Sequence, residues 1–163
     1  MSSSSLFYAV GKNNFDLLEK LIKTYKISDV NYLHFKWKKS LLLIATIENS
    51  YDIVKLLLES KIDVNQVFGD GVNALMLSLN YMLDKKVHND EITKLLIINK
   101  ININAENDKG FTSLMIACKD KYATSTIKLL IENKADINYK NKNALTALMC
   151  AVKENNYPVR TTR

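Results

Sequence analysis

The sequence predicts an all-α solenoid of stacked helix-turn-helix units, with β-turn or hairpin fingers projecting between the units. Two observations predict this fold: three sequence markers recur with one period, and each unit has two short apolar stretches that could not bury their apolar sides alone. Composition agrees, because 47% of the 163 residues are hydrophobic and 25% are charged. The 4 Gly and 1 Pro are too few for the many tight turns of a β-sandwich or barrel.

The repeat is visible in three independent markers. An asparagine closes each Asp/Asn-Val/Ile-Asn step, with spacings of 34, 39 and 34 residues, at Asn31, Asn65, Asn104 and Asn138. A leucine inside an apolar block recurs with spacings of 33, 39 and 34, at Leu42, Leu75, Leu114 and Leu148. A Leu-Leu pair recurs with spacings of 39 and 34, beginning at Leu56, Leu95 and Leu129. All three markers therefore agree that one middle unit is longer than its neighbours.

This period divides a single domain, residues 1–163, into approximate units. They are an N-terminal capping repeat at 1–34, then 35–67, 68–106, 107–140, and an incomplete C-terminal repeat at 141–163. We expect an insertion near 83–89 to lengthen the loop between the helices of the third unit. The unfinished last unit has two interpretations: the chain is a fragment of a longer array, or its polar end caps the last interface.

Each unit also carries local signals for helices and turns. Two residues before each marker leucine stands a side chain whose oxygen can accept a hydrogen bond from the first helical turn, at Ser40, Asn73, Thr112 and Thr146. Second helices are expected over residues 53–59 and 127–132, where apolar residues fall at helical spacing. Gly71 and Gly110, four residues before a marker leucine, permit a positive φ in a turn.

The unit that begins at residue 107 shows a family pattern. It reads Asn-Asp-Lys-Gly-Phe-Thr-Ser-Leu-Met-Ile-Ala at 107–117, then an apolar stretch at 127–131 and Lys-Ala-Asp-Ile-Asn at 134–138. This pattern resembles the ankyrin repeat, a β-turn followed by two antiparallel helices in about 33 residues. The resemblance covers residues 5–160 and implies an ankyrin-repeat solenoid.

The sequence departs from the family pattern at two positions of each unit. The family's histidine after the marker leucine is replaced by an apolar residue, which we expect to pack in the core, at Leu43, Met76, Met115 and Met149. The family's glycine at the end of the second helix is replaced by lysine, at Lys61, Lys100 and Lys134. A residue other than glycine in this left-handed position costs roughly 1 kcal/mol.

No constellation of residues predicts catalysis. The sequence lacks phosphate-binding glycine loops, the zinc-protease motif and the hydrolase nucleophile motif. His34 and His88 lie in different units, and Cys118 and Cys150 are expected to be small, reduced core residues. Carboxylates such as Asp90 stand near second-helix starts, where they oppose the positive helix end. We therefore predict a protein that is not an enzyme, with no catalytic residue, cofactor or metal.

The resemblance implies a partner-binding surface on the concave face, made by the finger tips and the exposed side of each first helix. Placed by register, the implied contact residues are Lys36, Trp37, Lys39, Ile47, Glu48, Asp70, Val72, Asn80, Tyr81, Asp108, Lys109, Phe111, Lys119, Asp120, Lys142 and Leu145. Aromatic residues often dominate binding energy, which favours Trp37, Tyr81 and Phe111. The alternative is local: Trp37 folds back on the first unit and Phe111 packs against the next finger.

We predict a non-catalytic scaffold or adaptor, a monomer that binds another protein or a peptide. One alternative is the targeting arm of a larger enzyme or of a ubiquitin-ligase-type adaptor, of which this chain would be a fragment. A nucleic-acid binder is less favoured: 23 Lys and Arg against 17 Asp and Glu give +6, but the lysines are scattered and both arginines stand at the end. No segment reads as a signal peptide or a membrane span, so we expect the cytoplasm, or a host cell's cytoplasm if the protein is viral or an effector.

Overall fold

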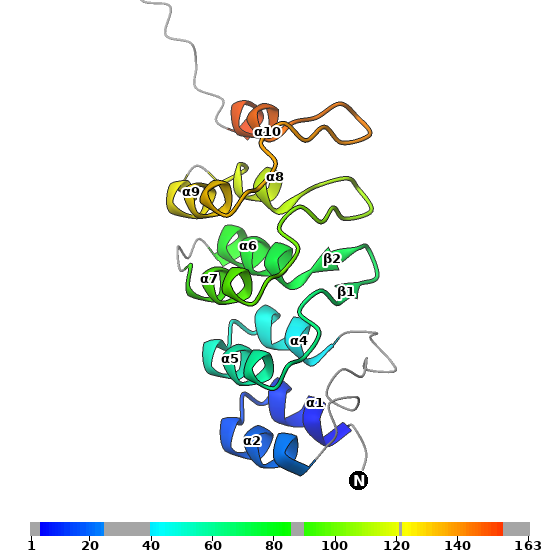
Figure 1. Ribbon diagram of the computed structural model, residues 1–163, viewed down its shortest axis with the longest axis vertical. Coiled ribbons are helices and arrows are strands. Elements are labelled where there is room, and N and C mark those ends of the chain that lie inside the picture. Colours follow the sequence, from blue (N-terminus) through cyan, green and yellow to red (C-terminus); the bar gives the residue numbers. More distant parts are fainter. Residues whose placement is uncertain (1–3, 25–39, 86–89, 121, 155–163) are drawn as a thin grey trace, which may run out of the picture.

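The computed structural model describes residues 4–24, 40–85, 90–120 and 122–154, and it shows helical hairpins stacked in one row (Figure 1). The elements, in chain order, are α1 (Ser4–Gly11), α2 (Phe15–Thr24), α4 (Leu41–Ile47), α5 (Tyr51–Glu59), β1 (Val67–Phe68), β2 (Val72–Asn73), α6 (Ala74–Lys85), α7 (Glu91–Ile98), α8 (Ser113–Ala117), α9 (Thr124–Glu132) and α10 (Ala147–Glu154). The predicted all-α solenoid is confirmed. Within the described residues, no helix is long and apolar enough to cross a membrane.

The helices form two layers, and the fingers project from one of them (Figure 1). The first helix of each unit contacts the first helix of the next, in the order α1, α4, α6, α8 and α10. The second helices α2, α5 and α7 lie on the other side of these, away from the fingers. Strands β1 and β2 pair antiparallel, with Val67 opposite Asn73, and so form the finger before α6. Each unit therefore shields the apolar faces of its neighbours.

The predicted N-caps are confirmed. In each of the four, the side-chain oxygen accepts a hydrogen bond from the backbone N–H three residues later, at 3.3, 3.0, 3.4 and 3.3 Å for Ser40, Asn73, Thr112 and Thr146. These bonds satisfy donors that a helix start leaves without an intrahelical partner. They fix where each first helix begins, and hence the register of the layer that faces the fingers.

The marker asparagines join neighbouring units. Asn65 accepts a hydrogen bond through Oδ1 from the backbone N–H of Asn102 at 2.7 Å. One unit later, Asn104 accepts from the N–H of Asp136 at 2.8 Å and donates through Nδ2 to the carbonyl of Lys134 at 3.2 Å. A side-chain amide is one of the few groups that can both accept and donate here. The periodic asparagine is therefore a requirement of stacking.

The core runs through the whole row. Its large side chains with almost no exposed surface come from every hairpin: Leu6, Leu18, Leu41, Leu42, Leu43, Ile53, Leu57, Leu75, Met76, Leu96, Met115 and Leu130. Burial of this kind contributes about 1.5–3 kcal/mol for each large apolar side chain. Three of the four apolar residues that replace the family's histidine are buried, as predicted. The fourth prediction was wrong, because Met149 is 51% exposed on α10, where no further hairpin of the described residues packs.

The insertion in the third unit lies partly in helix α6 and not in a loop alone. Helix α6 has 12 residues, against 7 in α4 and 5 in α8, and its last residues, 83–85, belong to the segment expected to be loop. Residues 81–85 contain no glycine or proline that would stop a helix. The prediction was therefore wrong for 83–85, while 86–89 lie outside the described residues.

The left-handed lysines are confirmed. Lys61, Lys100 and Lys134 have φ of 58°, 65° and 68°, and each directly follows the C-cap residue of its second helix. This conformation brings Cβ close to the following carbonyl, so glycine adopts it at lower free energy.

Lys134→Gly is expected to stabilise the protein by about 1 kcal/mol and to raise Tm by about 2–4 °C, because it relieves the left-handed strain. Differential scanning calorimetry measures this directly. Lys134→Ala is the matched control, since alanine carries the same Cβ and should bring no gain. An equal rise for both variants would show that loss of the lysine charge, rather than backbone relief, is responsible.

Candidate functional site

A pocket of about 530 Å³ opens between the end of α4 and the C-terminal half of α6. Its lining comes from two neighbouring first helices: Ile47, Glu48, Leu77, Asn80, Tyr81, Asp84 and Lys85. We call it the α4–α6 pocket. A volume of this size falls within the range of about 300–1,000 Å³ typical of ligand pockets.

The length of α6 shapes this pocket. Leu77, Tyr81 and Asp84 are spaced by four and then three residues, so they share one face of the helix. Because α6 is longer than α4, its last turn carries Asp84 and Lys85 beyond the point where α4 ends. The extended helix thus forms one wall, and Ile47 and Glu48 form the other.

The lining is apolar inside and charged at its rim. Ile47, Leu77, Asn80 and Tyr81 are half-buried, whereas Glu48, Asp84 and Lys85 are exposed. The lining carries two carboxylates and one ammonium, a net negative charge, although the whole chain carries +6. Among the residues that the structure describes, no side-chain hydrogen bond or ion pair engages Glu48, Tyr81 or Asp84.

The unit of α8 has a different arrangement at the same surface. The ammonium of Lys119 lies 4.0 Å from the centroid of the Phe111 ring, a cation–π contact. The backbone N–H of Phe111 donates to Oδ1 of Asn107 at 2.9 Å, which holds the finger. Phe111 is half-buried and packs against the core. One face of its ring is thus covered by the chain's own lysine.

The finger residues lie apart from the α4–α6 pocket. Asp70, Asp108, Lys109 and Lys142 are exposed, and Val72 and Leu145 are half-buried, but none of the six lines the pocket. The carbonyl of Asp70 accepts from the N–H of Asp108 at 2.9 Å, so consecutive finger tips are in direct contact. The fingers that carry these residues project on the same side of the stack (Figure 1).

The structure brings together some of the expected contact residues and not others. Glu48, Asn80 and Tyr81 meet in the α4–α6 pocket, and Phe111 and Lys119 stack on each other. Asp120 is engaged locally, because its Oδ1 accepts from the N–H of Tyr122 at 2.9 Å. The predictions for Lys36, Trp37 and Lys39, and for His34 and His88, lie outside the described residues.

Three pocket residues were missed from the sequence. Leu77, Asp84 and Lys85 were not among the expected contacts. For Asp84 and Lys85 the cause is the assignment of the insertion to a loop. The available signal was the helical spacing from Leu77 through Tyr81 to Asp84, uninterrupted by a helix breaker.

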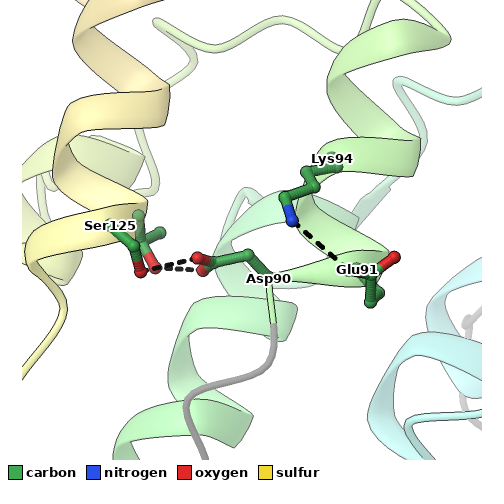
Figure 2. A network of polar contacts seen from close by, with 5 residues as sticks. Asp90, Glu91, Lys94 and Ser125 are labelled. Carbon is green, nitrogen blue, oxygen red and sulfur yellow. Dashed lines mark hydrogen bonds and ion pairs between the residues drawn. The ribbon is translucent and has the colours of Figure 1, made fainter.

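The acidic residue at the start of α7 has a structural role (Figure 2). The Asp90 carboxylate accepts hydrogen bonds from the hydroxyls of Ser125, at 2.7 Å, and of Thr126, at the start of α9. It stands at the start of α7, as expected, and makes no side-chain hydrogen bond to its own helix, so its hydrogen bonds link two units. Beside it, Lys94 and Glu91 form an exposed ion pair at 3.2 Å.

The cysteines are buried core residues, as predicted. Both are reduced thiols: Cys118 is the C-cap residue of α8, and Cys150 lies on the neighbouring helix α10. Burial raises the pKa of the Cys118 thiol, and the neighbouring Cys150 raises it further. The nucleophilic thiolate is thereby disfavoured. Within residues 4–24, 40–85, 90–120 and 122–154, no group of three or more His, Cys, Asp or Glu side chains is arranged to hold a metal ion.

Comparison with known proteins identifies the repeat. A family model described as "Ankyrin repeats (3 copies)" matches residues 6–87 and again residues 79–161. The two matches together span nearly the whole chain, in agreement with the stacked hairpins. A search of the curated proteins found no match.

Proposed function

Because the chain belongs to the ankyrin-repeat family, whose repeats are generally protein–protein interaction modules, we propose that it is a non-catalytic scaffold or adaptor. Its partner is a protein or peptide that lies along the finger tips and the exposed ends of the first helices. Family members are typically non-catalytic, which agrees with the absence of a catalytic motif in the sequence. The unit boundaries at 34, 67, 106 and 140, the monomeric state and the cytoplasmic location stay predictions.

One observation carries this proposal: the α4–α6 pocket is open and its polar groups have no partner among the described residues. Polar side chains that are removed from water are usually hydrogen-bonded, so half-buried polar groups without an internal partner are satisfied by solvent or by a ligand. The half-buried Tyr81 and Asn80 line this pocket together with the exposed carboxylates of Glu48 and Asp84. This combination of an aromatic residue with a polar rim is typical of the centre of a protein interface.

A nucleic-acid partner is disfavoured at this site. Phosphate groups require Lys and Arg side chains, and the pocket presents two carboxylates with one lysine. A role as the targeting arm of a larger enzyme or adaptor remains compatible, since such an arm would use the same surface.

Affinity capture with matched variants tests the proposal. Tyr81→Ala removes the pocket aromatic, whereas Tyr51→Ala removes an exposed tyrosine from α5, in the second-helix layer. We expect the wild type and Tyr51→Ala to retain the same prey and Tyr81→Ala to lose it, with circular dichroism showing that all three are folded. The interaction is then measured with the purified prey. Equal retention by Tyr81→Ala and Tyr51→Ala would remove the pocket from the binding surface.

A further inference from the structure

We propose that the α4–α6 pocket binds the guanidinium group of an arginine in a peptide segment of the partner protein. This inference rests on the proposed function and names the residue that the pocket recognises. The observation behind it is the combination, in one pocket, of two carboxylates without a partner among the described residues, an aromatic ring and two apolar side chains.

The charges of the pocket select a cation. Glu48 ends one wall and Asp84 ends the other, so two carboxylates from different helices border the same space. Neither forms an ion pair within the described part of the chain. A guanidinium offers five N–H donors in a planar fork and can bridge two carboxylates, which a single ammonium does less well. Phosphate or an acidic side chain would be repelled here.

The apolar part of the pocket fits the stem of the same side chain. Ile47 and Leu77 offer apolar surface for its methylene groups, while the charged head stays near the rim. The ring of Tyr81 can stack on the guanidinium plane. At about 530 Å³, the pocket also has room for a residue that flanks the arginine.

The next unit shows how a cation packs on an aromatic ring in this chain. In the unit of α8, the ammonium of Lys119 lies 4.0 Å from the centroid of the Phe111 ring. Tyr81 occupies a different repeat position, that of Asp120, since each stands six residues after its marker leucine. An arginine of the partner would make the same kind of contact with the Tyr81 ring.

Lys85 restricts which residues can flank the arginine in the partner's peptide. Its ammonium lies in the same lining as Asp84, so a second basic residue next to the arginine would be repelled. We infer a motif with one arginine flanked by neutral apolar residues, or by an acidic residue on the side of Lys85.

A peptide titration followed by NMR tests the inference. The full chain, labelled with ¹⁵N, is titrated with the blocked pentapeptide Gly-Leu-Arg-Leu-Gly and with the same peptide carrying citrulline, which keeps the shape and removes the charge. We expect the arginine peptide to shift the amides of Glu48, Tyr81 and Asp84. Citrulline should weaken binding by about fivefold to tenfold, and the difference should shrink at high salt.

Matched variants assign the effect to the carboxylates. Glu48→Gln with Asp84→Asn should weaken the arginine peptide by the same factor and leave the citrulline peptide unchanged. Glu59→Gln is the control, because this exposed glutamate lies at the end of α5 and does not line the pocket. Its titration should match that of the wild type.

Two results would overturn the arginine assignment. If arginine and citrulline peptides shift the same pocket amides with equal affinity, the pocket binds peptides without selecting charge, and the proposed function survives. If neither peptide shifts these amides up to its solubility limit, the arginine site is absent. Affinity capture with Tyr81→Ala then decides the proposed function separately.

Discussion

Leu75→Ala is expected to lower the free energy of unfolding by about 3 kcal/mol, a value within the range of about 2–5 kcal/mol for leucine truncations in cores. Leu75 is 0% exposed and lies on α6, which contacts α4 on one side and α8 on the other. Truncation leaves a cavity between three hairpins, and rigid helices on both sides limit collapse around it. Urea unfolding followed by circular dichroism gives the change in free energy.

Leu148→Ala is the control with the same chemistry at the same position of the repeat. Leu148 follows the marker spacing of Leu75, but it is 72% exposed on α10. Its truncation should therefore change the free energy of unfolding by less than about 0.5 kcal/mol. If both variants lost similar stability, the marker leucine would act through its own helix and not through the contact between units.

This pair of leucines shows where sequence reasoning reached its limit. The spacing of the markers predicted the position of each leucine within its unit, together with the caps before it. It treated Leu75, Leu114 and Leu148 alike, although only the first two are covered by a following first helix in the described residues. Burial in a solenoid depends on the next unit as well as on the residue itself.

The candidate site was predictable in part for a related reason. The positions of Glu48, Asn80 and Tyr81 within the repeat were enough to predict the surface on which the pocket is found. It could not supply Asp84 and Lys85, because they belong to the extra residues that have no counterpart in the other units. Their place depends on whether the insertion continues the helix or leaves it, and local helix propensity decided for continuation.

Contacts between individual side chains could not be predicted from the sequence. The repeat placed Asp90 at a helix start but did not show that Ser125 and Thr126 would donate to it from the next hairpin. Within one unit, too, Phe111 was considered either a partner contact or a residue packed on the next finger, and the contact of the Lys119 ammonium with its ring was not predicted. Such pairs depend on side-chain rotamers, which the repeat pattern does not specify.

Gly110→Ala is expected to destabilise the protein by about 2–3 kcal/mol, because the added Cβ brings both backbone strain and a steric clash. The backbone of Gly110 has φ of 73°, in the left-handed region, where a Cβ introduces strain. The added Cβ would also lie 2.9 Å from Cβ of Asn141 in the next finger. Asn141 cannot easily move, because it is buried and its Oδ1 accepts from the N–H groups of Asn143 and Leu145 at 3.0 and 2.9 Å.

Variants in two other finger turns distinguish the effect of the steric clash from that of the backbone strain. Gly69→Ala adds a Cβ with no atom within 4 Å and no positive φ, so its effect should be near zero. Ala144 occupies the repeat position of Gly110 with φ of 55°, so Ala144→Gly should relieve strain and stabilise by about 1 kcal/mol. Thermal unfolding of the three variants measures these effects. A loss for Gly110→Ala no larger than the gain for Ala144→Gly would mean that the fingers separate without cost, and that close contact of adjacent fingers does not hold the stack together.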